Sequence, residues 1–289
     1  MLGLSETGKA RFAYGFWRYR AEEIAAATEM LSLVRESGID HLDTADVYGG
    51  PGGFGGAEQL LGELRTRAPE LFKGAVIATK AGVEPGTPYN SSSAYLTAAC
   101  EASLSRLGVE QIDLFYIHRP DLLTHPCELA ETLDELVLSG KIGAVGVSNF
   151  TPAQVSALSN YLKAPLVALQ IEFSAAHVDP LFDGTLDQAT EYNIAVAAWS
   201  PLAGGRLATT DTPQLSRIHE TLRRIGERLG ASPQAIALAF VQRHPACVTP
   251  ILGTKTPARL GDCLKANALS LTRSDWYAIV EACLEKKMP

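Results

Sequence analysis

Eight short apolar segments recur along the chain, and this repetition limits the possible folds more than any other feature of the sequence. Each segment is almost continuous in apolar residues, which is typical of strands buried on both faces of a parallel sheet. Stretches with helical periodicity separate them, so the pattern predicts repeated strand–helix units. The predicted strands are residues 12–17, 39–42, 75–79, 112–117, 144–147, 167–171, 194–199 and 248–252.

Signals for helix boundaries stand between these strands. Leucines at helical spacing occupy residues 129–137, and Gly140 follows them as a stop signal. Three predicted helix starts combine a hydroxyl residue as N-cap with a proline in the first turn. They are Thr151-Pro152, where Gln154 completes a capping box, Ser232-Pro233 and Thr256-Pro257.

Eight strand–helix units in 289 residues predict a (β/α)8 barrel, the TIM-barrel fold, as one domain over residues 1–289 with an accessory C-terminal helix. Such barrels typically take ~250 residues. No low-complexity segment, charge block or Pro/Ser-rich linker divides the sequence. An open doubly wound sheet is the alternative that periodicity leaves open. In a barrel, the reactive groups follow the carboxyl ends of the strands.

Composition and charge argue against several classes of protein. A net charge of −7 without any basic run does not suit a nucleic-acid partner, which needs a cationic surface. No apolar segment reaches the ~18 residues of a membrane helix, and the first dozen residues lack a signal peptide's apolar segment. Five cysteines without a Cys-x-x-Cys pair predict a cytoplasmic location. Six histidines without ligand spacing predict that no metal is bound.

Four residues that suit acid catalysis follow three consecutive predicted strands. Asp43 and Tyr48 follow the second strand, Lys80 the third and His118 the fourth. A tyrosine with a pKa of ~10 is a poor proton donor at pH 7, and a neighbouring ammonium such as Lys80 lowers that pKa. Asp43 would hold Lys80 charged, and His118 would orient the substrate oxygen. The set is suited to protonating a developing alkoxide, which implies a hydride donor.

These residues stand in motifs that resemble the aldo-keto reductase superfamily. In family order over residues 12–268, the motifs are Asp43-Thr44-Ala45-Asp46-Val47-Tyr48-Gly49, Ala78-Thr79-Lys80, Leu114-Phe115-Tyr116-Ile117-His118, Gly146-Val147-Ser148-Asn149-Phe150 and Ala198-Trp199-Ser200-Pro201-Leu202. Within the superfamily, the segments His118-Arg119-Pro120-Asp121 and Asp183-Gly184-Thr185-Leu186-Asp187 resemble those of bacterial reductases. The resemblance implies a barrel that binds NADPH without a Rossmann fold and reduces an aldehyde or ketone to an alcohol. It makes Tyr48 the proton donor, tuned by Lys80 and Asp43, with His118 orienting the substrate.

The resemblance also implies a set of residues that bind NADPH. The carboxamide would be bound by Ser148, Asn149 and Gln170, and the nicotinamide ring would stack on Trp199. The pyrophosphate would lie along Ser200, Leu202, Gly204, Gly205 and Arg206, and the 2′-phosphate would bind at a helix start formed by Gly253, Lys255, Thr256 and Arg259. The adenine would contact Asp262, and the first-strand contact would come from Gly15, Phe16 and Trp17, with Asp43. Two positions depart from the family pattern. Cys263 replaces an Asn near the adenine, and Phe16 replaces a Thr, so a hydroxyl contact there is lost.

The predicted substrate is a small aldehyde or ketone. The residues expected to contact it are Trp17, Tyr48, Phe54, His118 and Arg119. Selectivity would reside in the loops 81–92, 119–126 and 206–214. The sequence does not fix the oligomeric state, and a monomer is compatible with it.

Three competing interpretations remain at this point. The loop Gly50-Pro51-Gly52-Gly53-Phe54-Gly55 satisfies Gly-x-Gly-x-x-Gly, but the next strand ends in Thr79-Lys80 where a Rossmann unit needs an acidic residue or a phosphate-binding Arg. We therefore interpret the glycine-rich segment 50–55 as a flexible loop beside Tyr48 and not as a Rossmann turn. A regulatory or sensor subunit that binds NADPH and turns over slowly is a second possibility. A hydrolase or lyase that uses Asp43 and Asp46 is a third.

Overall fold

The computed structural model describes Leu4, residues 12–50 and residues 53–288. Eight parallel strands form a closed barrel in the order β1 to β8. They coincide with the eight predicted segments, with ends displaced by no more than two residues, so the (β/α)8 barrel is confirmed and the open sheet is excluded. The strands are β1 (Ala13–Gly15), β2 (His41–Asp43), β3 (Val76–Ala81), β4 (Leu114–Ile117), β5 (Val145–Ser148), β6 (Leu166–Glu172), β7 (Ala195–Trp199) and β8 (Thr249–Leu252).

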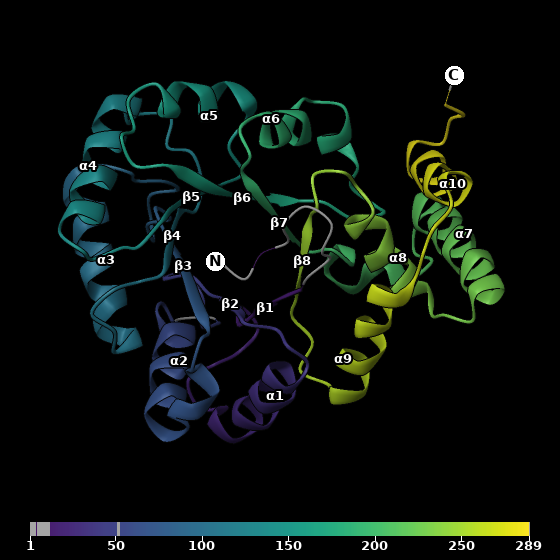
Figure 1. Cartoon of the computed structure of the whole chain (residues 1–289), viewed down its shortest axis with the longest axis horizontal. Coiled ribbons are helices and arrows are strands. Elements are labelled where there is room, and N and C mark those ends of the chain that lie inside the picture. Colours follow the sequence, from purple (N-terminus) through teal and green to yellow (C-terminus); the bar gives the residue numbers. More distant parts are fainter. Residues whose placement is uncertain (1–3, 5–11, 51–52, 289) are drawn as a thin grey trace. The chain divides into compact units, whose positions relative to one another are not determined.

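Helices connect the strands, and short 3-10 turns extend some of the connections (Figure 1). The α-helices are α1 (Ile24–Glu36), α2 (Gly56–Arg67), α3 (Ser93–Leu107), α4 (Pro126–Leu138), α5 (Pro152–Ser159), α6 (Thr185–Glu191), α7 (Pro213–Leu229), α8 (Pro233–Gln242), α9 (Pro257–Leu264) and α10 (Arg273–Leu284). The 3-10 turns are η1 (Pro69–Phe72), η2 (Asp179–Leu181), η3 (Ala203–Ala208) and η4 (Lys265–Ala268). Among the described residues, no helix is both long enough and apolar enough to cross a membrane.

The three predicted helix starts are N-caps in the structure. Thr151 and Gln154 form the expected capping box of α5. Ser232 accepts a hydrogen bond from the Ala235 amide at the start of α8. Thr256 occupies the N-cap position of α9, but its side chain caps no amide. The start of α9 therefore depends on Pro257 in the first turn and on packing rather than on a side-chain cap.

The described residues group into two compact units, residues 13–170 in the first and residues 171–288 with Leu4 and Phe12 in the second. The prediction of a single domain over residues 1–289 stays a prediction. In the first unit, α2 to α5 lie outside the strands (Figure 1). Its strands pair in parallel with a register that aligns Gly15, Asp43 and Ala78. The carboxyl ends of β1 and β2 therefore lie beside Ala78, three residues before the carboxyl end of β3.

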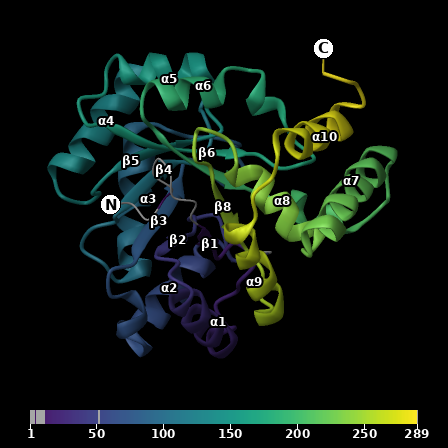
Figure 2. The ribbon, with the colours of Figure 1, turned by 45° about the vertical axis from the view of Figure 1, so that its right-hand side comes forward.

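The second unit contains a helix that the repeat of eight units does not predict. Two helices, α7 and α8, stand between β7 and β8. The additional helix, α7, lies beside α10, the expected C-terminal helix (Figures 1 and 2). An ion pair from Arg228 to Asp275 at 2.5 Å joins the two helices, and a second pair at 3.0 Å connects Arg217 to Glu285, the residue after the end of α10. The inner face of α7 is buried through Leu215, Ile218, Leu222 and Ile225, a spacing that suits an amphipathic helix.

Candidate active site

A fully buried ion pair connects the ends of β2 and β3. Lys80 Nζ lies 2.8 Å from Asp43 Oδ2 and 2.7 Å from the Thr44 carbonyl oxygen. The second oxygen of Asp43 accepts a hydrogen bond of 2.8 Å from Gln170 Nε2. A buried ion pair needs such additional hydrogen bonds to offset the loss of hydration. Burial acts to lower the pKa of Lys80, but Asp43 and Tyr48 outweigh it and raise that pKa, so the ammonium stays charged.

The Tyr48 ring lies against both Lys80 and His118. The Lys80 ammonium is 5.0 Å from the centre of the ring, and the His118 ring meets it edge-on at 5.6 Å between centroids. The backbone of Tyr48 is fixed on both sides, because its amide donates to Ala45 and its carbonyl accepts from Ala57, each at 3.1 Å. The four residues that the sequence places after three strands therefore lie together in the first unit.

The expectation of an unusually acidic Tyr48 is wrong for this structure. Burial raises the pKa of the phenol, the Lys80 ammonium lowers it, and the Asp43 carboxylate raises it again. The effect of Lys80 has the predicted direction, but burial is larger, and the pKa of Tyr48 lies above its ordinary value. The hydroxyl is consequently protonated at neutral pH and holds a proton that it can donate.

His118 is a neutral imidazole in this environment. It is 9 % exposed, and burial lowers its pKa to about 3, with Lys80 and Arg119 acting in the same direction. The buried Nδ1 atom has no hydrogen-bond partner among the described residues. A neutral ring next to two cations can donate or accept a hydrogen bond without adding a third positive charge.

This environment predicts that His118 does not titrate between pH 8 and pH 4. In the unfolded chain its pKa is ~6.5, so the unfolded state binds the proton first and the free energy of unfolding falls as the pH drops from ~6.5 towards 3. We expect His118→Asn to weaken that acid dependence in urea unfolding at pH 7, 5 and 4. Ring nitrogen shifts in NMR, assigned with the same variant, report the titration directly. A midpoint near 6.5 would contradict the buried neutral ring.

Three polar residues at the ends of β5 and β6 form a connected group. Asn149 Nδ2 donates to Ser148 Oγ at 2.8 Å and to the His118 carbonyl at 3.3 Å. The Asn149 amide donates to the Gln170 carbonyl at 2.9 Å. Asn149 has a φ of 61°, a left-handed conformation that Asn tolerates better than most residues and that is often retained at functional sites. The bond from Gln170 to Asp43 connects this group to the ion pair, a link that the sequence does not indicate.

The first-strand residues differ in their access to ligand. Gly15 pairs in register with Asp43. Phe16 is fully buried, its amide donates to the Asp43 carbonyl and its own carbonyl accepts from Tyr19, each at 2.9 Å. The side chain of Phe16 is therefore packed in the core, and both of its backbone polar groups are already hydrogen-bonded within the fold. Trp17 is 51 % exposed and remains accessible. The predicted cofactor contacts of Gly15, Phe16 and Trp17 stay predictions.

The remaining predicted substrate contacts belong to the loops of the first unit. Phe54 is 41 % exposed, and the Arg106 guanidinium lies 5.9 Å from the centre of its ring. Arg119 is half-buried, and its charge acts on both Tyr48 and His118. Pro51 and Gly52 of the glycine-rich loop lie outside the described residues, so our interpretation of that loop stays a prediction. In its described part, the Gly55 amide donates to the Asp46 carbonyl at 2.6 Å.

In the second unit, the segment after β7 has an unusual backbone. Ser200, Ala203, Gly204 and Gly205 all have positive φ angles, of 48°, 51°, 69° and 101°. The two glycines are exposed, and turns of this kind direct successive amides towards anions. Ser200, Gly204 and Gly205 are among the predicted ligand contacts here. Of the others, Trp199 and Leu202 are half-buried, and Arg206 is exposed and donates to the Ala203 carbonyl.

The start of α9 carries the other predicted phosphate residues. Lys255, Thr256 and Arg259 are exposed, and Gly253 is half-buried after the end of β8. Asp262 is already engaged by the fold, because it accepts from Ser232 Oγ at 2.5 Å and pairs with Lys265 at 3.1 Å. Cys263 is buried. The two cations at α9 are therefore accessible to an anion, whereas Asp262 serves a structural role in this state.

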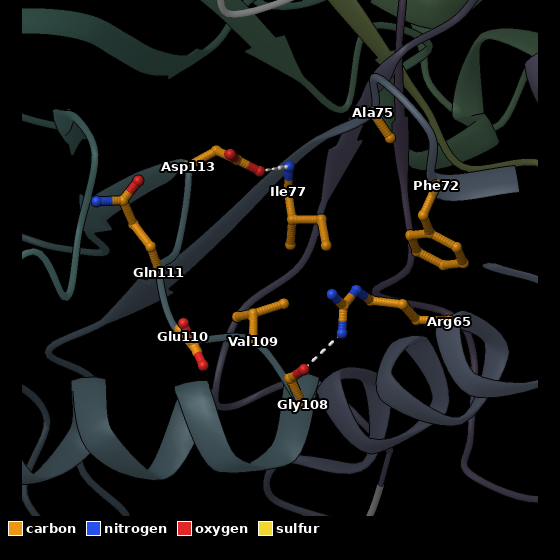
Figure 3. A pocket seen from close by; sticks show the side chains of 9 residues that line it. All are labelled: Arg65, Phe72, Ala75, Ile77, Gly108, Val109, Glu110, Gln111 and Asp113. Carbon is orange, nitrogen blue, oxygen red and sulfur yellow. Dashed lines mark hydrogen bonds between the residues drawn. The ribbon is translucent and has the colours of Figure 1, made fainter. Parts of the chain in front are cut away.

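A cavity of about 490 Å³ lies at the opposite ends of the strands in the first unit (Figure 3). Two of its polar side chains are held by backbone groups: Arg65 donates to the Gly108 carbonyl at 2.5 Å, and Asp113 accepts from the Ile77 amide at 2.8 Å. None of the predicted site residues lines it. Among the described residues, no three His, Cys, Asp or Glu side chains are grouped to hold a metal ion.

Comparison with protein families gives one match over nearly the whole chain. Residues 7–284 match the Aldo/keto reductase family. A 6-dehydroglucose reductase of Novosphingobium aromaticivorans is 40 % identical over 292 residues, which cover 100 % of this chain and 96 % of the relative. An oxidoreductase of Escherichia coli is 34 % identical over 287 residues, which cover 97 % and 95 % of the two chains.

The same similarity extends to solved structures. The glycerol dehydrogenase of Gluconobacter oxydans superposes with a TM-score of 0.85 at 25 % identity, with 99 % of this chain and 96 % of that chain covered. A thermostable aldo-keto reductase, solved with the inhibitor epalrestat, superposes with a TM-score of 0.81 at 23 % identity, over 96 % of this chain and 99 % of that chain. At that identity, the second similarity supports the fold alone.

Proposed function

The chain belongs to the aldo/keto reductase family of oxidoreductases, and from that premise we propose that it is an NADPH-dependent reductase that converts an aldehyde or ketone to an alcohol. The observation that carries the proposal is the contact of Tyr48 with a buried Lys80 ammonium on one side and a neutral His118 on the other. This arrangement places a protonated phenol beside a fixed positive charge. Such a group can protonate an oxygen on which negative charge develops.

The residues present suit a pyridine nucleotide. In the first unit, the side chains of Ser148, Asn149 and Gln170 offer the donors and acceptors that a carboxamide needs. In the second unit, the left-handed segment around Gly204 and Gly205 offers exposed backbone to a pyrophosphate. When bound, NADPH supplies the hydride. Trp199 would pack on the nicotinamide ring, and Asp262 would contact the adenine only if its bonds to Ser232 and Lys265 open.

Tyr48 would act as the general acid of the reaction. Its hydroxyl donates a proton to the carbonyl oxygen of the substrate, which becomes the hydroxyl of the alcohol. Lys80 stabilises the phenolate that remains, and Asp43 keeps Lys80 charged and fixed in place. The pKa of Tyr48 lies above its ordinary value, so the phenol is fully protonated before the reaction and releases its proton when charge develops on the substrate.

His118 would orient the substrate. The pKa of His118 is about 3, so the ring is neutral and can donate a hydrogen bond to the same carbonyl oxygen from one nitrogen. The His118 carbonyl is held by Asn149, which fixes the residue relative to the proposed carboxamide site. Exposed Trp17 and Phe54 would provide apolar walls around the substrate.

The substrate class can be narrowed by chemistry and by the relatives. Arg119 next to Tyr48 and His118 would favour a polar or anionic substrate over a purely apolar one. One relative is named a 6-dehydroglucose reductase and another a glycerol dehydrogenase. We therefore place polyhydroxylated aldehydes first among the aldehydes and ketones to be tested. The five cysteines are free thiols, which suits the proposed cytoplasmic location.

The direct test is NADPH oxidation by the purified protein with a panel of aldehydes and ketones, followed by absorbance. The panel contains sugar aldehydes, short polyol aldehydes, aromatic aldehydes and simple ketones. We expect turnover with at least one class and quenching of tryptophan fluorescence by NADPH alone. Quenching without turnover on any substrate would favour the regulatory subunit. Absence of both would remove the reductase proposal.

The hydrolase or lyase alternative has little support from the geometry. It needs two carboxylates that reach a substrate. Asp43 is occupied by Lys80 and Gln170, and Asp46 is fully buried. The pair therefore does not offer an acid and a base to one ligand.

The proposed 2′-phosphate site gives a prediction about cofactor choice. A charge-assisted hydrogen bond contributes ~1.5–3 kcal/mol, and 1.4 kcal/mol corresponds to a tenfold change in affinity. We expect Lys255→Ala with Arg259→Ala to raise the Kd of NADPH by about 10- to 100-fold and to leave that of NADH within about twofold. Arg224→Ala, an exposed arginine on α7, is the matched control. Equal losses for both cofactors would contradict the assignment.

A further inference from the structure

A second group of buried charges lies directly behind the Lys80 strand. Asp46 and Glu58 are both fully buried. The Asp46 amide donates to the Lys80 carbonyl at 3.0 Å, so this residue is attached to the same strand that carries the ammonium. Among the described residues, no side chain donates a hydrogen bond to the Asp46 carboxyl, and the Val47 amide is the backbone group that acts on it. An ionised carboxylate in that state would be very costly.

In Glu58 of α2, by contrast, both carboxylate oxygens accept a hydrogen bond. One of its oxygens accepts from Thr79 Oγ1 at 2.5 Å, and the other from Arg106 Nε at 2.6 Å. Thr79 and Lys80 are neighbours on β3, and alternate side chains of a strand point to opposite faces. Thr79 therefore connects Glu58 to the outer face of the strand whose inner face holds Lys80.

The charges in this region do not balance if every group is ionised. Lys80 is paired with Asp43, and Arg106 is paired with Glu58. The third carboxyl, Asp46, has no cation of its own. A neutral Asp46 resolves the imbalance without breaking either pair.

We propose that Asp46 is a positioning residue for the proton transfer from Tyr48. When Asp46 is a neutral acid, it does not compete with Asp43 and Tyr48 for the Lys80 ammonium. As a carboxylate it partly offsets the ammonium, which makes the Tyr48 phenolate less stable and the phenol a weaker acid. This proposal rests on the proposed reductase function for its effect on turnover, but its effect on Tyr48 is independent of catalysis.

The groups around Asp46 support the proposal. Burial raises the pKa of Asp46 to about 8, and the charge of Glu58 from α2 adds to this, whereas Arg106 from α3, the Val47 amide and Lys80 from β3 act in the opposite direction. Tyr95 of α3 also faces the group, and burial together with Asp46 raises the pKa of Tyr95 to about 12. The carboxyl of Asp46 therefore changes its charge within the range in which a cytoplasmic enzyme is assayed.

The first experiment measures Tyr48 itself, without cofactor or substrate. NMR of protein labelled with ¹³C at the tyrosine hydroxyl-bearing carbon follows the titration of Tyr48, assigned with Tyr48→Phe. Because Asp46 is ionised at the alkaline pH at which Tyr48 titrates, we expect the Tyr48 midpoint to fall by about half a pH unit or more in Asp46→Asn. Equal midpoints would overturn the proposal, whatever the protein catalyses.

The second experiment measures kcat for carbonyl reduction from pH 6 to pH 9.5 at saturating NADPH. In the wild type we expect kcat to decrease above pH 8 as Asp46 loses its proton. In Asp46→Asn we expect kcat at pH 6 within about threefold of the wild type and no decrease near pH 8. An unchanged decrease in the variant, or a loss of the same size at every pH, would overturn the proposal.

Two further variants test whether the effects come from the Asp46 carboxyl. Asp46→Ser removes the carboxyl with a smaller neutral side chain, and we expect it to shift the Tyr48 midpoint in the same direction if Asp46→Asn does not fold. Glu63→Gln removes an exposed carboxylate on α2 that pairs with Arg67 at the surface. It should leave both the Tyr48 midpoint and the pH profile unchanged. If no carbonyl compound is reduced at any pH, the reductase proposal fails and the Tyr48 titration still decides the role of Asp46.

Discussion

Replacing Tyr48 with Phe is expected to lower kcat for carbonyl reduction by a factor of ~10² to 10⁴, the usual contribution of a general acid. The substitution removes one hydroxyl and keeps the ring that packs on Lys80 and against His118. The hydrogen bond between Lys80 and Asp43 does not involve that hydroxyl, so the fold and the proposed nicotinamide-binding residues should be preserved. The loss should therefore appear in kcat, with little change in the affinity for NADPH.

Two controls distinguish loss of the proton donor from a general disturbance of the active site. Fluorescence titration gives the Kd of NADPH, which we expect to stay within about twofold of the wild type. Tyr161→Phe removes a hydroxyl from a half-exposed ring elsewhere in the first unit and should leave kcat unchanged. Wild-type turnover by Tyr48→Phe would exclude Tyr48 as the proton donor. A parallel loss of cofactor binding would indicate a structural role instead.

The strands could be located from the sequence because burial on both faces leaves a nearly continuous apolar run. The carboxyl end of β3 could not, since the predicted strand stops at Thr79, whereas β3 continues to Ala81. Lys80 belongs to β3 and pairs in register with Tyr116, although the apolar run ends before it. The barrel accommodates Lys80 inside because Asp43, Thr44 and the neighbouring strands satisfy it. Only the folded environment shows that this polar residue is interior.

The candidate site was predictable as a set of residues but not as a network. The order of motifs along parallel strands indicates which side chains meet at one rim, and Asp43, Tyr48, Lys80 and His118 do meet. It does not indicate that Gln170 bonds Asp43, because β2 and β6 are not neighbours in the strand order. It also does not give the pKa of Tyr48, because burial, which outweighs Lys80 there, depends on every segment that covers the ring.

The role of Asp46 is a second example of what the sequence alone does not predict. In the sequence it is one of two acids close to Tyr48, and spacing alone makes it a candidate for acid–base work with Asp43. In the structure it is fully buried and faces Glu58, Arg106 and Lys80. The charged groups that act on it come from three different elements, α2, α3 and β3. A role for Asp46 therefore follows from charge balance among these elements and not from any local motif.

The largest effect on stability is expected from breaking the Asp43–Lys80 pair on one side only. Lys80→Met leaves a buried carboxylate with Gln170 as its remaining side-chain donor, and Asp43→Asn leaves a buried ammonium with the Thr44 carbonyl. Removing one partner of a buried pair typically costs about 3–5 kcal/mol of the free energy of unfolding. Urea unfolding at pH 7 measures this cost, and both variants should also lose most of their turnover because the Tyr48 phenolate is no longer stabilised.

The double variant Asp43→Asn/Lys80→Met distinguishes a paired charge from two separately important residues. If the cost of each single variant comes from an unpaired buried charge, then removing both charges should restore stability relative to either one, with a coupling energy of roughly 3 kcal/mol. Turnover should not recover, because no ammonium faces Tyr48. Lys141→Met, which breaks the exposed pair with Glu101, should change stability little. Additive losses in the double variant would show that Asp43 and Lys80 stabilise the barrel through separate contacts, and the ammonium would then not owe its charge and position to Asp43.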